Sequence, residues 1–435
     1  MISNKKFKKI LNDIKRRSED AAIDLNIDKA QIDKYISGES AIPFKVIKRA
    51  VKKWSLNYND FFDIQDDAPL GYKHMSCKES NLSERLMFRK NKPYYLYKDT
   101  AYSRLSPFKP EWIEELLVVD DNDPNNESVV FNNGHFLHQF TYFIGYVNFY
   151  YIIDNKKYVQ EMNTGDSMYI SPYIPHSFAT RRNEENINGV ILALTYTDKL
   201  DHNCVDELNA IGIDLSKNYQ LNLENELESF KSNLRYHLNV NSLSLIELEK
   251  QTKIENLKNI FKINQLPKLK DIKKIAECLN VNLRDMLPYS KNKEVVILRS
   301  SEQKKWYFPE DSKKYFFKEL ASSINIPTSR AFEVIIKNDD LSFDHHICTP
   351  THQYIYNLGE HKCSINLNDS TVDLNHGDSI YLKPNLKHTF IGNNSKLLIL
   401  RTGGKISGDQ LLHLSLFTEK NLNRLIDDKK TWFEY

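Results

Sequence analysis

The sequence predicts an α+β protein in which one plan, a helical segment followed by a double-sheet β-barrel, occurs twice in tandem. Gly165–Phe178 aligns without gaps on Gly377–Phe390, and half of the aligned positions are identical. Upstream of these segments, Ile47–Asp60 corresponds to Ile272–Asp285. Because both pairs occur in the same order and at similar separations, we interpret the chain of 435 residues as a tandem duplication of a two-part unit.

The helical parts are predicted from apolar residues at three-to-four spacing, such as Ile10 and Ile14. Asp28–Glu39 is expected to contain a second helix that Gly38 closes in a turn. Pro43 stands where it can open the last helix, because the first turn of a helix tolerates the missing N–H. Two helices joined by a tight turn give a helix-turn-helix-like outline.

The β parts are predicted from short aromatic and β-branched runs that turn signals interrupt, for example at Asn132–Gly134 and Asn163–Gly165. Many short strands at this spacing favour a double-sheet barrel. We therefore expect a helix-turn-helix-like domain, a first barrel, a second helical domain and a second barrel, at residues 1–66, 67–215, 216–290 and 291–435.

Composition excludes several classes of protein. Sixty Lys and Arg residues against 58 Asp and Glu leave a net charge of +2, so the whole molecule has no strong field for nucleic acid or an anionic membrane. The five cysteines are scattered without a CxxC pair, which argues against a disulfide framework or a thiolate zinc site and fits a reducing cytosol. Met1–Ile10 lacks the apolar core of a signal peptide, and the longest apolar run, Phe140–Ile153, is too short for a membrane helix. We expect a soluble, cytoplasmic protein with no membrane partner.

The candidate chemistry centres on His176. Gly165–Phe178 resembles the second motif of the cupin barrel (a double-stranded β-helix or jelly roll), in which a histidine after a proline points into the barrel. Upstream, His135 and Gln139 are four residues apart, so on a strand they share a face, whereas His138 has the wrong parity. A straight strand would hold the pair about 13 Å apart.

The pair can share a metal only if the chain bends there, which Gly134 would permit. A facial Fe(II) site needs three protein ligands on one side and open positions opposite. A lone barrel histidine is more often a packed residue, and an amide oxygen alone is a poor ligand, so the metal hypothesis rests on the combination of His135, Gln139 and His176. The second copy carries Thr349, Gln353 and His388 at these places, and without one histidine we expect that barrel to be metal-free and structural.

A helix-turn-helix fused to a cupin, with Asn-x-x-His-x-x-x-(acid or amide) and a distant Pro-His, resembles the phosphonate-processing non-haem iron family. That family includes hydroxypropylphosphonate epoxidases, 2-hydroxyethylphosphonate dioxygenases and methylphosphonate synthases. The epoxidases place glutamate where Gln139 stands, and the dioxygenases take a carboxylate from the position of Ile170. Here both carboxylates are missing, and the set of His135, Gln139 and His176 is similar to the 2-His-1-Gln triad of the synthases.

The resemblance also implies residues that bind the substrate. Arg89 and Tyr97 correspond to an arginine and a tyrosine that hold phosphonate oxygens, Asn132 to a substrate-binding asparagine, and Lys15 to a phosphonate-binding lysine. A dianion needs such charge-assisted donors. The alternative reading of Lys15 is a solvated helix face, and Arg89 and the tyrosines could be surface and core. If Lys15 does reach the site, the family's shared helical domains imply that it comes from another subunit of a dimer or tetramer.

The implied reaction is the Fe(II)- and O2-dependent cleavage of the C–C bond of 2-hydroxyethylphosphonate, which gives methylphosphonate and bicarbonate. The sister reaction, which gives hydroxymethylphosphonate and formate, is the near alternative, since residues beside the ligands such as Ile170 could decide the product.

A different class is a helix-turn-helix transcription regulator with a sensing cupin. Residues 1–60 carry 14 Lys and Arg against 8 Asp and Glu, which would help phosphate contacts. Residues 28–36 nevertheless mix both charge signs where a groove-reading helix needs donors, so we expect no nucleic-acid partner.

Overall fold

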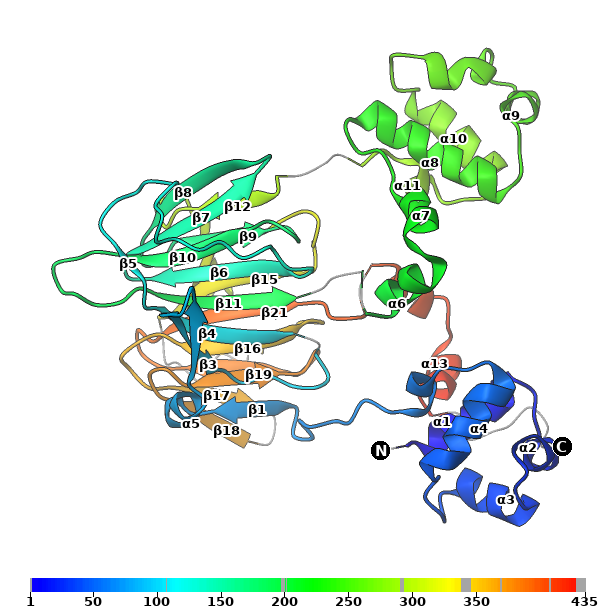
Figure 1. The fold of residues 1–435 in the computed structure, drawn as a ribbon, viewed down its shortest axis with the longest axis horizontal. Helices are drawn as coiled ribbons and strands as arrows, with labels where there is room; N and C mark the ends of the chain where they lie inside the picture. The colour runs from blue at the N-terminus through cyan, green and yellow to red at the C-terminus, as the bar shows by residue number, and fades with distance from the viewer. Residues whose placement is uncertain are drawn as a thin grey trace.

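A computed structural model describes residues 2–106, 108–196, 200, 202–289, 293–337, 346–367, 370–406 and 408–427. The β-strands gather on one side of the molecule together with the short helix α5 (Cys77–Leu82), and the other labelled helices lie on the opposite side (Figure 1). Among the described residues, no helix combines the length and the apolar character that crossing a lipid bilayer requires.

The first large sheet is antiparallel and has seven strands. Its order is β12 (Val295–Leu298), β9 (Ser167–Ile170), β6 (His138–Ile144), β11 (Val190–Tyr196), β4 (Lys109–Glu115), β3 (Lys92–Asp99) and β2 (Arg85–Arg89). A four-stranded sheet faces it, in the order β5 (Val118–Val119), β10 (His176–Arg181), β7 (Val147–Ile153) and β8 (Lys156–Met162). The apolar residues between these two sheets, including Phe143, Phe149 and Phe178, form one buried cluster.

The second large sheet repeats this arrangement. Its order is β1 (Tyr72–Met75), β19 (Ser379–Leu382), β16 (His352–Asn357), β21 (Lys396–Thr402), β15 (Arg330–Ile336), β14 (Tyr315–Glu319) and β13 (Lys305–Phe308). A three-stranded sheet faces it, in the order β18 (Ser370–Leu374), β17 (Cys363–Leu367) and β20 (His388–Ile391). The aligned segments Gly165–Phe178 and Gly377–Phe390 thus occupy equivalent places, a turn followed by β9 and β10 or by β19 and β20.

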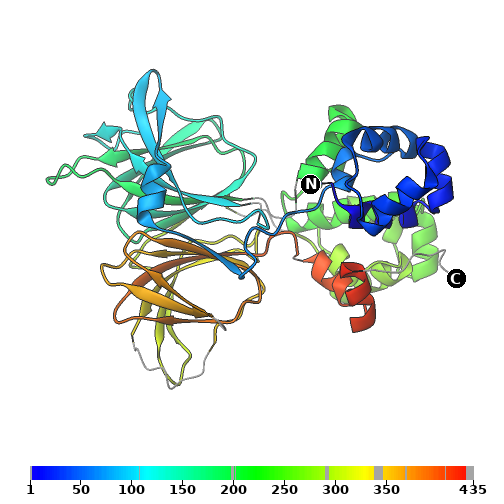
Figure 2. The same ribbon diagram turned by 90° about the horizontal axis from the view of Figure 1, so that it is seen from below.

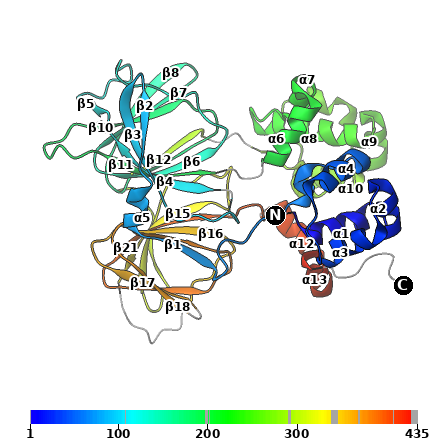
Figure 3. The ribbon, with the colours of Figure 1, turned by 60° about the horizontal axis from the view of Figure 1, so that its bottom comes forward.

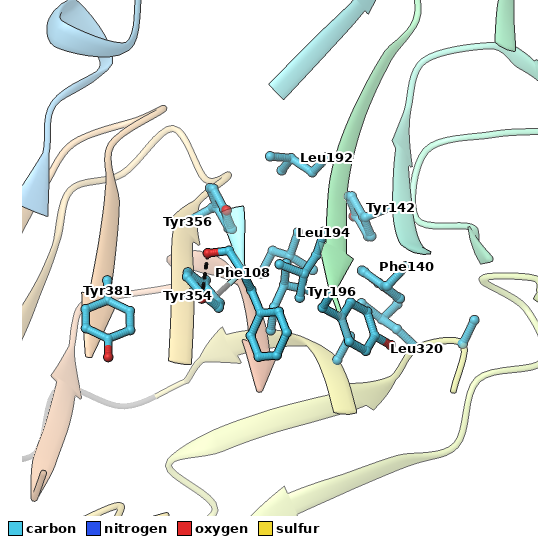
Figure 4. Close-up of a cluster of buried hydrophobic side chains, with 14 of the residues drawn as sticks. Phe108, Phe140, Tyr142, Leu192, Leu194, Tyr196, Leu320, Tyr354, Tyr356 and Tyr381 are labelled. Atoms are coloured by element: carbon cyan, nitrogen blue, oxygen red, sulfur yellow. Dashed lines mark hydrogen bonds between the residues drawn. The ribbon is translucent and has the colours of Figure 1, made fainter. Parts of the chain in front are cut away.

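The two large sheets pack against each other, so that the two β units are stacked (Figure 2). The interface is rich in tyrosine and leucine, and Tyr142, Tyr354 and Tyr381 lie in it (Figure 4). Their hydroxyl groups find partners despite burial, as when Tyr354 donates to the carbonyl of Phe108 at 3.0 Å. Aromatic side chains with a hydrogen-bonding end therefore hold the two halves together.

The two β units exchange one strand each. β1 precedes the strands of the first sheet in the chain but pairs with β19 of the second, with Tyr72 opposite Leu382. In return, β12 from the second half pairs with β9 of the first sheet, with Val295 opposite Ile170. The sequence analysis did not predict this exchange.

The N-terminal helices are α1 (Asn4–Asp13), α2 (Ser18–Leu25), α3 (Lys29–Ser37) and α4 (Phe44–Trp54), with a 3-10 turn, η1 (Tyr58–Phe61). They pack around a buried cluster that includes Phe7, Ile32 and Ile47. Asp28 caps the start of α3 by accepting from the N–H of Ala30 at 2.8 Å, and Gly38 ends it in the left-handed conformation with φ 86°. The predicted helix closed by Gly38 is therefore confirmed.

A second helical group contains α8 (Glu226–Val240), α9 (Leu245–Thr252), α10 (Leu269–Cys278) and α11 (Leu283–Met286), with η3 (Leu257–Lys262). The remaining helical segments are α5 (Cys77–Leu82), α6 (His202–Ile211), α7 (Ile213–Ser216), η2 (Lys217–Tyr219), α12 (Asp409–Leu414) and α13 (Glu419–Ile426). The last two lie beside the N-terminal helices (Figure 3), where Lys5 contacts Asp427 at 3.3 Å. The chain thus leaves the second β unit and returns to its N-terminal helices.

Candidate metal centre

A bend before β6 brings the first two predicted metal ligands together. Gln139 lies in β6, and His135 lies in the segment that leads into it. Gly134 has φ +72°, and a Cβ atom there would come within 2.4 Å of the backbone of Tyr173. The N–H of Tyr173 in turn donates to the carbonyl of His135 at 2.8 Å. The bend predicted at Gly134 is present, and it places His135 Nε2 3.1 Å from Gln139 Oε1.

His176 completes the group from the opposite sheet. It is the first residue of β10, is 4% exposed, and its ring centroid lies 5.2 Å from that of His135. His138 instead points to the other face of its sheet, where its Nδ1 contacts the hydroxyl of Tyr169 at 2.8 Å, as its parity predicted. The sequence-predicted trio of His135, Gln139 and His176 therefore converges, and His138 is outside it.

Backbone carbonyls fix the tautomers of both histidines. His135 Nδ1 donates to the carbonyl of Leu137, and His176 Nδ1 to that of Ile174, each at 2.8 Å. With the proton on Nδ1, each Nε2 presents a lone pair. Burial also lowers the pKa of His176 to about 4, which keeps the ring neutral at physiological pH. Neutral imidazoles with the proton on Nδ1 suit metal coordination through Nε2.

The Gln139 amide is oriented in the same sense. Its Nε2 donates to Thr141 Oγ1 at 2.9 Å, so its Oε1 faces His135. His135 Nε2 and Gln139 Oε1 both present lone pairs, so their 3.1 Å separation is not a hydrogen bond. The distance matches the separation of about 3 Å between adjacent ligands of an octahedral ion with bonds of about 2.1 Å. The donor set fits a divalent metal. The set of two histidines and one glutamine contains no carboxylate. Within the described part of the chain, no three His, Cys, Asp or Glu side chains form a group that could hold a metal ion.

A cavity of about 170 Å³ adjoins the three ligands. Its lining includes the predicted substrate residues Arg89, Tyr97 and Asn132. Asn132 is held in place because its Oδ1 accepts from the N–H groups of His176 and Gly134, at 2.9 and 3.0 Å. Its Nδ2 lies 3.1 Å from His176 Nε2. The cavity therefore brings the three candidate metal ligands together with hydrogen-bond donors from Arg89, Tyr97 and Asn132.

Arg89 is fixed by aromatic rings. Its guanidinium lies 4.9 Å from the ring centre of Tyr94 and 4.8 Å from that of Tyr95, and it donates to the carbonyl of Val130 and to Ser177 Oγ. The hydroxyls of Tyr94 and Tyr95 also meet Ser177 Oγ, at 2.9 and 3.2 Å. Tyr94 and Tyr95 are thus buried residues that orient Arg89. Tyr95 and Tyr97 line the cavity, and burial raises the pKa of the Tyr97 hydroxyl.

Two predicted residues do not line the cavity. Ile170 is fully buried in β9 and lies directly opposite Gln139 in the sheet register, so its side chain packs beside Gln139 on the same face of the sheet. Lys15 follows α1 in the N-terminal helical group and takes the left-handed conformation with φ 57°. Within one chain, the lining of the cavity does not include it.

The lining also contains residues that the sequence analysis missed. Glu111 and Glu115 alternate with Ile113 along β4 and share its inward face, and Thr195 lies opposite Gln139. Glu111, Ile113 and Glu115 are two residues apart and therefore share a face of a strand, and this spacing is the signal that could have revealed the two glutamates.

The equivalent place in the second β unit holds a guanidinium. Arg401 lies opposite Gln353 in the register, as Thr195 lies opposite Gln139, and Arg401 Nε donates to Gln353 Oε1 at 3.0 Å. Gln353 Nε2 is 3.5 Å from His388 Nε2, and Thr349 Oγ1 contacts Thr351. A fixed cation thus uses the amide oxygen that a metal would need, which is a physical reason for expecting this barrel to be metal-free.

Known proteins resemble this chain in sequence and in fold. No protein-family model matches the chain. The chain is 44% identical over 441 aligned residues to methylphosphonate synthase of Nitrosopumilus maritimus (strain SCM1), an alignment that covers 99% of this chain and 95% of that protein. A solved structure of the Streptomyces albus dioxygenase HEPD, with 2-hydroxyethylphosphonate and Fe(II) bound, superposes with a TM-score of 0.92 at 31% identity and covers 99% of this chain and 98% of its own.

A structure of PhpD with cadmium shares the fold, with a TM-score of 0.74 at 16% identity over 97% of this chain and 99% of its own. The mixed helix and strand architecture is therefore that of HEPD. Because the identity to the Nitrosopumilus maritimus protein is high and extends over nearly the whole of both sequences, this chain belongs to the methylphosphonate synthase family.

Proposed function

We propose that this chain is an Fe(II)-dependent oxygenase that uses O2 to cleave the C–C bond of 2-hydroxyethylphosphonate and releases methylphosphonate and bicarbonate. The observation that carries the proposal is the carboxylate-free group of His135, Gln139 and His176 beside a cavity with Arg89. The family membership and the HEPD structure with the same substrate and metal support it.

The charge of the site favours a phosphonate dianion. His135, Gln139 and His176 are all neutral donors, so they leave the full charge of a divalent ion in the cavity. The Arg89 guanidinium adds a second positive charge. Arg89 and Tyr97 would donate charge-assisted hydrogen bonds to the phosphonate oxygens.

The roles of the protein groups follow from their places. Bound Fe(II) would supply the electron-transfer chemistry with O2 and polarise the substrate hydroxyl. His135, Gln139 and His176 would hold the metal, and Asn132 would orient the substrate next to His176. Tyr97 keeps its proton, because burial raises the pKa of its hydroxyl, and so it remains a donor to the phosphonate. Ile170, beside Gln139 on the same face of the sheet, puts an apolar side chain where HEPD-type chemistry would place a ligand.

Lys15 acts in trans under this proposal. Its place after α1, away from the cavity lining of its own chain, fits delivery to the cavity of a neighbouring subunit. We therefore propose a homo-oligomer, a dimer or a tetramer, with a small-molecule substrate and without nucleic-acid or membrane partners.

The finer architecture is part of the proposal. We read the chain as a tandem duplication with helix-turn-helix-like domains at 1–66 and 216–290, a catalytic cupin at 67–215 and a metal-free cupin at 291–435. The scattered free cysteines support a cytoplasmic location.

Phosphorus NMR of the products tests the function. Protein loaded with Fe(II) without oxygen is mixed with 2-hydroxyethylphosphonate and then exposed to air, and methylphosphonate is the expected product. Hydroxymethylphosphonate would overturn the synthase in favour of the dioxygenase. Unchanged substrate with iron bound would overturn both reactions. The Gln139→Ala variant is the control for chemistry by unbound iron.

A further inference from the structure

Glu115 places an unpartnered carboxyl group in the proposed substrate cavity. It is the last residue of β4, its side chain is fully buried, and it lines the cavity together with Arg89. Within the described part of the chain, neither carboxyl oxygen has a hydrogen-bond partner. The backbone is fixed at both ends, because the N–H donates to Gly189 at 2.9 Å and the carbonyl accepts from Thr180 Oγ1 at 2.5 Å. The side chain is therefore held in the cavity by the strand and not by polar contacts of its own.

The surroundings of Glu115 favour the neutral acid. Burial raises the pKa of this carboxyl well above its ordinary value, the charge of Glu114 raises it further, and Arg89 lowers it. An ionised carboxylate without hydrogen bonds is far more costly to bury than a carboxylic acid. The titratable and charged groups around Glu115 are Arg89 of β2, Tyr94, Tyr95 and Tyr97 of β3, Glu111 and Glu114 of β4, and His135 and His176 of the proposed metal-binding group, whereas β11 contributes Ile191, Ala193 and Thr195.

The charge state of Glu115 decides how much positive charge the cavity offers. Arg89 is the cation nearest to Glu115 in the cavity, and Tyr95 lies directly opposite Glu115 in the strand register. An ionised Glu115 would cancel the charge of Arg89 and repel an anion. A protonated Glu115 leaves that charge to the ligand.

We infer that Glu115 is a positioning residue whose carboxyl stays protonated at neutral pH, so that Arg89 offers its full charge to the phosphonate group, and that its ionisation at alkaline pH weakens substrate binding. The inference rests on the proposed function for the identity of the ligand. At neutral pH the proton stays on a carboxyl oxygen of Glu115 while the substrate binds and reacts. Glu115 makes and breaks no bond to the substrate.

The experiment measures the dissociation constant of 2-hydroxyethylphosphonate for the Fe(II)-loaded protein, without oxygen, from neutral to alkaline pH. In the wild type the constant is expected to rise by about tenfold per pH unit above the pKa of Glu115. Glu115→Gln keeps the shape and the neutral charge of the protonated side chain. Its dissociation constant is therefore expected to equal that of the wild type at neutral pH and not to show this rise at alkaline pH. Ionisation of the substrate and of the metal site is common to both proteins, so it cancels in the ratio of their dissociation constants.

Glu114→Gln is the matched control. It removes a carboxylate from the neighbouring residue, whose side chain bonds Asn188 at 2.8 Å outside the cavity. It should keep the alkaline rise, displaced slightly to lower pH because Glu114 raises the pKa of Glu115. Parallel curves for wild type and Glu115→Gln would overturn the inference. Tighter binding by Glu115→Gln at neutral pH would also overturn it, because that result means that the wild-type carboxyl is ionised there.

Infrared spectroscopy of the wild type keeps the inference testable if Glu115→Gln does not fold. A carbonyl band of a protonated carboxylic acid that shifts when 2-hydroxyethylphosphonate binds is expected at neutral pH, and the absence of any such band overturns the inference. A wild-type protein that fails to bind the substrate at every pH would instead overturn the proposed function.

Discussion

Gln139 Oε1 lies 3.1 Å from His135 Nε2, although both atoms carry lone pairs once their neighbours fix the tautomer and the amide. Two acceptors at this distance repel each other, and a cation beside both would relieve the repulsion. The hydrogen bond between Gln139 Nε2 and Thr141 Oγ1 orients the amide oxygen toward His135. Under the proposed function, the affinity for the metal would therefore depend on Thr141, which is not one of the three proposed ligands.

Thr141→Val should lower the affinity for Fe(II) by about 10- to 100-fold, the usual cost of removing a group that orients a metal ligand. The substitution nearly preserves volume but removes the acceptor of the Gln139 amide. Anaerobic titration with Fe(II) measures the effect. Thr195→Val is the matched control, because Thr195 lines the cavity but, among the described residues, its hydroxyl makes no hydrogen bond to Gln139. Equal losses in both variants would contradict the orienting role.

Gly134→Ala should abolish stable iron binding, because the added Cβ would approach the backbone of Tyr173 to 2.4 Å and open the bend that carries His135. Gly38→Ala is the control, since Gly38 shares a positive φ but has open space around its Cβ position. That variant should lose only about 1 kcal/mol of stability and keep its iron. Metal analysis after gel filtration distinguishes the two. Iron retained in Gly134→Ala would show that the site does not need the bend.

The stability of the metal-free protein should fall as the pH drops from about 6.5 to about 4. Burial lowers the pKa of His138 and of His352 to about 4, from an ordinary value of 6.5. Between these values the unfolded chain binds more protons than the folded one, so the free energy of unfolding decreases with falling pH. Urea midpoints at pH 7 and pH 5 measure the change. The double variant His138→Gln/His352→Gln should show a smaller drop, and an unchanged drop would assign the effect to other groups.

The second β unit should gain a metal site when its guanidinium is removed and its missing histidine is restored. In Thr349→His/Arg401→Thr, Gln353 Oε1 is freed and a second imidazole is added next to His388. Metal analysis is expected to give twice the wild-type iron content. Thr349→His alone should not, because Arg401 still occupies the amide oxygen. Extra iron in this single variant would show that Arg401 is not the obstacle.

Much of the site could be predicted because its signals are local. The repeated Gly165–Phe178 segment fixes where His176 enters the barrel, and the spacing of His135 and Gln139 with a preceding Gly134 predicts both the shared face and the bend. The parity of His138 correctly excluded it.

Other features were out of reach because they depend on contacts between distant segments. Nothing in residues 109–115 reveals that the Glu115 carboxyl lacks partners among the described residues, since that depends on how other strands surround it. The obstructing role of Arg401 appears only once β21 is set in register with β16. The exchange of β1 and β12 is a pairing between halves, and local patterns of hydrophobicity do not specify which sheet an edge strand joins.

Because β1 and β12 are exchanged, cutting the chain between its two halves would separate each β unit from one of its strands. Neither half is a complete folding unit, because each lacks one edge strand and carries the one that its partner needs. Two polypeptides cut between the halves would each expose an open sheet edge and should recover the native arrangement only by associating with each other. A single ancestral copy with the same exchange would have existed as a domain-swapped pair of identical chains, which gene fusion later joined covalently.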